Sequence, residues 1–209
     1  MENTKRMLDQ NNRSGKKIST QTIVGVGILT ALVVVLQFVS MYLLRFSMFS
    51  ITLTLIPIVV GAALFGWKWG AWLGFVFGVA VLLTGDAALF MAINIPATIA
   101  TVLVKGAMAG LCAGLVYKLL EKKGEVIAVL IASITAPVVN TGIFLIGCRL
   151  FFFETIKEWG VTNGFDNVAA YMFFGLAGIN FLIELGTNLI LNPVAVRIIG
   201  IGKNKFFKK

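Results

Sequence analysis

Histidine is absent from this 209-residue sequence, and cysteine occurs only twice, at positions 112 and 148. Without histidine, Ser-His and His-Asp catalytic pairs cannot be built, and a zinc or haem site lacks its commonest ligands. Cys112 and Cys148 belong to different apolar runs at opposite expected depths, so a disulfide between them is not expected. The sequence therefore predicts a protein that is not an enzyme and that holds no cofactor or metal.

Charge is scarce as well, at 13% of residues, about half the share in soluble domains, while 58% are hydrophobic and the mean hydropathy is +0.94. A helix of roughly 20 residues crosses a hydrocarbon core of about 30 Å. The sequence therefore predicts an all-α membrane protein, a bundle of six transmembrane helices. The expected spans are Thr22–Leu44, Ile51–Phe65, Trp69–Leu83, Ala97–Leu119, Val126–Leu150 and Tyr171–Ile199.

The second and third spans are short for full crossings. Pro57 inside the second predicts a kink, and tilt is the alternative. A single hairpin dipping into the membrane is a further possibility, but Gly66–Gly70 reads GWKWG, and two Trp flanking a Lys are typical of an interfacial turn.

The distribution of basic residues predicts that both termini are cytoplasmic, because Lys and Arg are enriched in cytoplasmic segments. Fourteen lie on the side of the termini, and only Arg45, Arg149 and Lys157 lie on the other. Residues 1–21 form a polar tail without the apolar region of a cleaved signal peptide, residues 22–201 the membrane domain, and residues 202–209 a basic tail. The chain is expected in the cell membrane, with no nucleic-acid partner.

A nucleotide site is also missing, since no Gly-rich loop ends in Gly-Lys-Ser or Gly-Lys-Thr. No span carries paired carboxylates for a proton relay. A six-span transporter of this kind would depend on partner proteins for energy.

What the sequence does have is glycine at spacings of four. One stripe comprises Gly66, Gly70, Gly74 and Gly78, and a second comprises Gly106, Gly110 and Gly114. Glycine costs roughly 1 kcal/mol in a water-exposed helix, but in lipid it permits close helix contact. Each stripe is expected either to pack inside the bundle or to face another protein.

Ionisable side chains inside the expected spans are few, and such residues usually lie in a cavity with a partner. Lys105 lies nine residues inward from Pro96, hence about 13 Å deep. Asn140 and Asn180 lie at similar depths, and Glu184 follows Asn180 by one turn. The four groups either form a Lys105–Glu184 ion pair tied by amides or line an outward-facing pocket for a small polar ligand, and the two can coexist.

The connections at residues 84–97 and 151–170 would cover this pocket and serve as lids. Asn94 lies in the first of them, where it either caps the next helix or contacts ligand. Asp86 is expected to be solvated.

Four segments, in this order and spacing, resemble the substrate-binding S components of energy-coupling factor (ECF) vitamin transporters. They are SITLTLIPIVVGAALFGWKWGAWLGFVFG, NIPATIATVLVKGAMAGLCAGLVYKLL, NTGIFLIGC and INFLIELGTNLILNP. The resemblance implies six helices, an external pocket over the outer halves of helices four to six, and docking onto a membrane T component that carries two cytoplasmic ATPases.

The family docks through Ala-x-x-x-Ala in helix one, and the nearest match here is Gly27-x-x-x-Ala31. The branch most similar is associated with pantothenate, whose carboxylate would suit Lys105. Its hydroxyls and amide would suit Asn140, Asn180 and Glu184. A riboflavin, folate or other vitamin pocket is an alternative.

Two other classes compete with this interpretation. A membrane enzyme would need a nucleophile and a base in one cavity, which the sequence disfavours. A self-sufficient carrier or channel, oligomerised through the glycine stripes, is the stronger rival.

Overall fold

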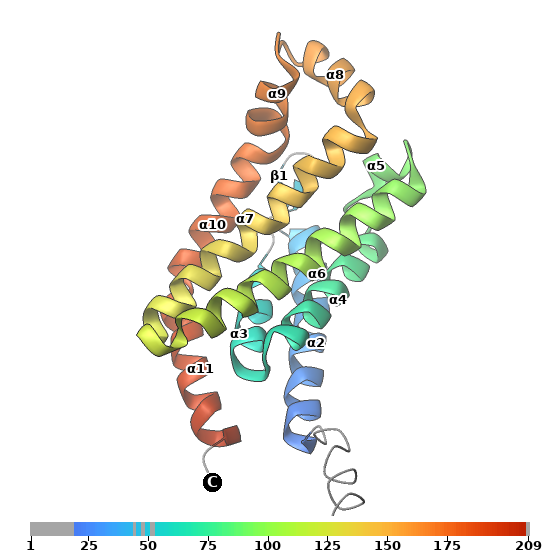
Figure 1. Cartoon of the computed structure of the whole chain (residues 1–209). Helices are drawn as coiled ribbons and strands as arrows, with labels where there is room; N and C mark the ends of the chain where they lie inside the picture. The colour runs from blue at the N-terminus through green and yellow to red at the C-terminus, as the bar shows by residue number, and fades with distance from the viewer. Residues whose placement is uncertain (1–18, 44, 47–48, 51–52, 208–209) are drawn as a thin grey trace, which may run out of the picture.

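The computed structural model describes residues 19–43, 45–46, 49–50 and 53–207, and nearly all of them are helical (Figure 1). The elements are α2 (Thr20–Leu43), strands β1 (Arg45–Phe46) and β2 (Phe49–Ser50), α3 (Leu55–Phe65), α4 (Trp67–Thr84), α5 (Ala88–Met91), α6 (Ile95–Leu120), the 3-10 turn η1 (Glu121–Lys123), α7 (Glu125–Phe151), α8 (Phe153–Thr162), α9 (Val168–Ala170), the π-helix η2 (Tyr171–Gly178), α10 (Ile179–Ile190) and α11 (Asn192–Phe207).

Five of these stretches are long and apolar enough to cross a membrane, and α3 is a shorter apolar helix. The candidate spans are Thr20–Leu43, Trp67–Thr84, Ile95–Lys123, Glu125–Phe151 and Val168–Ile190. The chain is therefore a multi-pass, all-helical protein apart from the antiparallel β1–β2 pair. A sixth full crossing, through α3, stays a prediction.

Three boundaries differ from the sequence prediction. The second helix begins at Leu55 rather than residue 51, so Pro57 falls in its first turn, where proline is tolerated and no kink follows. The predicted sixth span ends at Ile190, because Pro193 cannot donate the next helical hydrogen bond. A separate helix, α11, then runs to Phe207, through the expected start of the tail at residue 202.

Three of the four glycines in the first stripe, Gly70, Gly74 and Gly78, pack inside the bundle, which is one of the two expected uses. A Cβ atom added at Gly70 or Gly74 would overlap the backbone carbonyl of Gly110 or Gly106 on α6, and one at Gly78 would lie 2.8 Å from the Val102 carbonyl oxygen. Helices α4 and α6 thus meet backbone to backbone. Gly66 is different: with φ 98° it makes the turn between α3 and α4.

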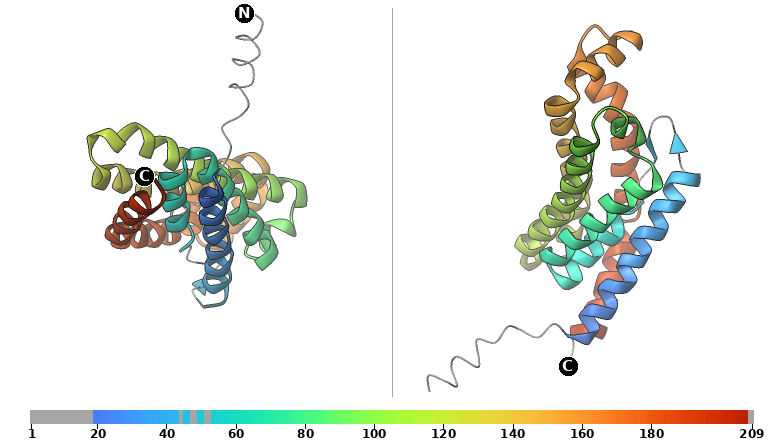
Figure 2. Two further views of the ribbon diagram at one scale, coloured as in Figure 1. Left: turned by 90° about the horizontal axis from the view of Figure 1, so that it is seen from below. Right: turned by 90° about the vertical axis from the view of Figure 1, so that its right-hand side faces the viewer.

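The start of α2 and the end of α11 lie at the same end of the bundle, as Figures 1 and 2 show, which matches two termini on one side. That this side is cytoplasmic stays a prediction. At the opposite end, α5 and α8 occupy the two connections that were expected to serve as lids.

Candidate functional site

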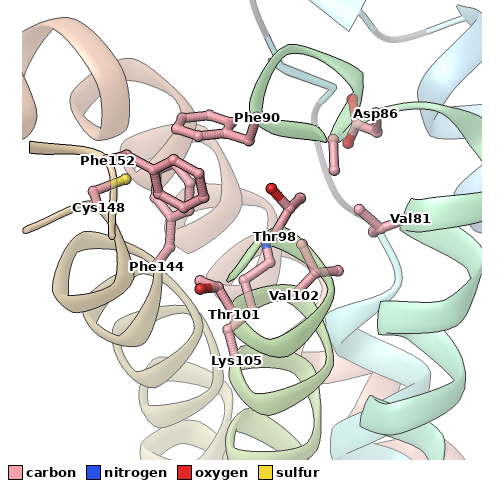
Figure 3. Close-up of a pocket in the computed structure, with 11 residues that line it drawn as sticks. Val81, Asp86, Phe90, Thr98, Thr101, Val102, Lys105, Phe144, Cys148 and Phe152 are labelled. Atoms are coloured by element: carbon pink, nitrogen blue, oxygen red, sulfur yellow. The ribbon is translucent and has the colours of Figure 1, made fainter. Parts of the chain in front are cut away.

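A pocket lies at the end of the bundle that carries α5 and α8, between α4, α5, α6 and α7 (Figure 3). About 390 Å³ of space lies between its side chains, counting the part open to the outside. The lining residues are Val81, Asp86, Ala87, Phe90, Thr98, Thr101, Val102, Lys105, Phe144, Cys148 and Phe152.

Aromatic rings make the roof and one wall of this pocket. Phe90, from the α5 turn, has its ring centroid 5.5 Å from that of Phe144, 5.0 Å from that of Phe152 and 5.8 Å from that of Trp159, each in an edge-to-face arrangement. Such pairs stabilise contacts beyond simple area burial. They join α5 to α7 and α8 over the pocket.

Lys105 supplies the positive charge of the pocket. Its Nζ atom lies 5.3 Å from the centroid of the Phe144 ring, a cation–π distance. Among the described residues, no carboxylate oxygen lies within 4.0 Å of this nitrogen. The Lys105–Glu184 ion pair, one of the two arrangements that the sequence left open, is therefore not formed within that distance.

The hydroxyl groups of Thr98 and Thr101 lie on the same face of α6 as Lys105. Thr98 donates its hydroxyl to the Asn94 carbonyl at 2.7 Å, but the buried Thr101 hydroxyl has no hydrogen-bond partner. Thr101 is held against α7 because Gly147 leaves no Cβ in its way. A cation, a carboxylate from Asp86 and an unpartnered hydroxyl in an aromatic-walled pocket suit a small polar ligand with an apolar part.

The other predicted site residues lie elsewhere. Asn94 caps α6, its Oδ1 accepting from the Ala97 amide at 3.1 Å, so capping is the role that the structure displays. Asn140, Asn180 and Glu184 do not line the pocket of Lys105. Asn140 and Glu184 are buried between helices, whereas Asn180 is partly exposed. Asn140, Asn180 and Glu184 thus do not share the pocket of Lys105.

Sequence reasoning missed two kinds of site residue. Asp86 was expected to be solvated, but it is half-buried and lines the pocket. The second kind is the buried amides of Asn188 and Asn192. The signal for them was available in the sequence, because polar residues recur every fourth position from Asn180 through Glu184 to Asn192 and so share one helix face.

The fold and this pocket define a multi-pass membrane protein with a pocket between its helices near one end. Residues 21–196 match the family model "ECF transporter, substrate-specific component". The chain belongs to this family, whose members are transporter subunits rather than enzymes. The expectation from the resemblance is therefore confirmed at the level of the class.

A solved structure, ThiT from Listeria monocytogenes, has a similar fold. It is 22% identical, has a TM-score of 0.59, and the match covers 86% of this chain and 93% of that chain. No curated protein matches the chain by sequence.

Proposed function

We propose that this protein captures a water-soluble, anionic vitamin outside the cell for import by an ECF transporter, and that pantothenate is its ligand. It then hands the vitamin on by docking, through Gly27 and Ala31, onto a T component that carries two ATPases. Family membership supports the capture role in general. The plasma membrane is its expected location.

The observation that carries the choice of an anionic ligand is Lys105. A cation at this depth is costly unless an opposite charge or a polar cavity compensates it. Its neighbours in the pocket include the ring of Phe144 and the Thr101 hydroxyl, neither of which neutralises it, while Asp86, which also lines the pocket, makes an interaction of its own. A ligand carboxylate would supply the missing charge.

The rival function, a self-sufficient oligomeric carrier, is weakened by the same packing that forms the bundle. Gly70, Gly74 and Gly106 are occupied by contacts within the chain, so they offer no surface to a second copy.

Calorimetric titration of Lys105→Met with pantothenate tests the proposal. If Lys105 binds the carboxylate, the change should cost roughly 2 to 5 kcal/mol of affinity, the range for removing one partner of a buried charge pair. Adding Glu184→Gln should not restore the affinity. Lys68→Met, at an exposed position on α4, is the matched control and should bind like the wild type.

Recovery of binding in the double variant would mean instead that Lys105 and Glu184 balance one another. A wild-type protein that ignores pantothenate but binds a neutral vitamin tightly would refute the ligand and leave the transporter class intact.

A further inference from the structure

An apolar groove lies between α7 and the stretch formed by η2 and α10, and it shares no lining residue with the pocket described above. It consists of two adjoining hollows that have Phe173, Gly178 and Phe181 in common. One hollow continues along the η2 side to Ala169, and the other continues onto α7 as far as Val138. We call the two together the α7–η2 groove.

The backbone on both sides opens this groove. On α7, Gly142 lines it, and a Cβ added there would meet nothing within 4 Å. On the other side, Tyr171–Gly178 forms a π-helix, a rare conformation that often occurs at functional sites. A Cβ at Gly178 would lie 2.8 Å from the Phe173 carbonyl oxygen, so this wide turn requires glycine there.

The groove faces the surroundings of the protein rather than its core. Phe173 is 60% exposed, Phe174 72% and Leu182 64%, and all three lie in the candidate span Val168–Ile190. Thr141 is the single polar side chain among the lining residues of the two hollows. Lipid tails are as apolar as such side chains and surround them in a membrane. The matching occupant is therefore a hydrocarbon chain.

A cation marks one end of the groove. Arg149 follows the lining residues Leu145 and Gly142 by four and seven positions, so it lies on the same face of α7. This is the end of the bundle that carries α8 and α9 (Figure 1). The Arg149 guanidinium carbon lies 3.9 Å from the centroid of the Phe153 ring, a cation–π contact. In the described part of the chain, no carboxylate oxygen lies within 4.0 Å of the guanidinium nitrogens.

The length of the groove matches one leaflet of a bilayer. Val138 and Arg149 are eleven residues apart, which is about 16 Å along α7 at a rise of 1.5 Å per residue. Half of a hydrocarbon core of about 30 Å is about 15 Å. A phospholipid with its phosphate at Arg149 would therefore lay one acyl chain along the whole groove. Arginine suits this place because its planar N–H fork pairs with two phosphate oxygens.

We propose that the α7–η2 groove binds an anionic phospholipid of the surrounding bilayer, with its phosphate at Arg149 and one acyl chain between Gly142 and Gly178. The apolar lining selects hydrocarbon. The guanidinium selects an anionic headgroup, because a zwitterionic headgroup carries a cation of its own and neutralises Arg149 less well. The site is independent of the vitamin proposed above, so its test uses no vitamin.

Native mass spectrometry of the purified full-length protein in detergent tests the site. The delipidated protein is titrated with dioleoyl phosphatidylglycerol, which is anionic, or with dioleoyl phosphatidylcholine, which has the same chains and no net charge. The Kd of the first bound lipid is measured for the wild type, Arg149→Gln and Gly142→Leu. Val138→Trp fills the same groove from a half-exposed position and serves as the second filling variant if Gly142→Leu does not fold.

Two variants are matched controls. Lys157→Gln removes another exposed cation at the same end of the bundle, on α8 rather than on the groove face of α7. Gly186→Leu adds the same side chain at another glycine where a Cβ meets nothing within 4 Å, but Gly186 lines neither hollow. Both should bind the two lipids like the wild type.

The wild type should bind the anionic lipid roughly fivefold more tightly than the zwitterionic one, the effect expected of one basic residue at an anionic lipid surface. Arg149→Gln should make the two Kd values equal, because the headgroup contact is lost while the groove remains. Gly142→Leu and Val138→Trp should weaken binding of both lipids by roughly tenfold, because the new side chain takes the place of the acyl chain.

Three results would overturn the proposal. Equal Kd values of the wild type for the two lipids exclude a headgroup contact at Arg149. Unchanged lipid binding in the filling variants places the lipid elsewhere on the surface. A wild-type dimer that the filling variants convert into monomers means that a second copy of the chain occupies the groove.

Discussion

At the scale of single residues, the clearest ionic contact in the described part of the chain lies far from the pocket, at the end of the bundle that carries α11. Lys203 Nζ is 3.5 Å from Glu125 Oε2, and it lies 5.3 Å from the centroid of the buried Tyr117 ring. Burial lowers the pKa of Lys203, but the neighbouring Tyr117 and Glu125 outweigh it, so the pKa is raised above its ordinary value of 10.5. The contact joins α11 to α6 and α7.

A raised pKa makes this contact pH-dependent. The stability that it contributes is present below the ordinary lysine pKa and is lost as the pH rises through the higher folded value. The Tm of the wild type, followed from pH 9 to pH 11.5, should therefore fall more steeply above about pH 10.5 than the Tm of Lys203→Met. Parallel curves would show that the contact contributes no stability. Because the pair is only partly buried, we expect the effect to be small.

At the scale of elements, the α4–α6 contact sets the shape of the bundle, because backbone meets backbone at Gly74 and Gly106. Its position also places Lys105 and Thr101, which lie on the part of α6 that faces α7. In water, glycines at these positions would weaken both helices.

Replacing Gly74 with Ala should destabilise the protein by about 1–3 kcal/mol, the usual cost of overpacking. The added Cβ would overlap the Gly106 carbonyl, which is backbone and cannot rotate away. Gly186→Ala is the control, since a Cβ there meets nothing within 4 Å. Thermal unfolding in detergent measures both, and equal Tm values would contradict the packing.

At the scale of the whole molecule, one outer face of α2 is left uncovered by the chain itself. Gly27 and Ala31 are exposed, and a Cβ at Gly27 would meet nothing within 4 Å. Exposed apolar side chains surround them, among them Ile23, Val24, Ile28, Leu32 and Val35. This surface fits the proposed docking of a T component.

Ala31→Trp should abolish vitamin uptake by cells that supply the T component and ATPases, because its bulk would hold a partner helix away. Binding by the purified subunit should be nearly unchanged, since residue 31 does not line the pocket. Ile179→Trp, at an exposed site on α10, is the control and should keep both activities. Full uptake by Ala31→Trp would exclude docking through this face.

How far the sequence predicts the site depends on the residue. The depth of Lys105 follows from helix rise alone, and the structure places it in a pocket. Its separation from Glu184 could not be predicted, because depth fixes the height of a side chain but not the direction in which it points. Phe90 and Asp86 were missed for a related reason. They lie in or just before the α5 turn, which has no apolar periodicity from which their positions could be predicted.

Taken by itself, the sequence determined the solvent and the class. Scarce charge and long apolar runs require a membrane protein, and glycine every fourth residue requires close helix contact in lipid. Only the tertiary structure decided which groups share a cavity. Rotation of α6 against α7 turns Lys105 toward Phe144, and the register of α10 leaves Asn188 unpaired, because both depend on packing between segments distant in sequence.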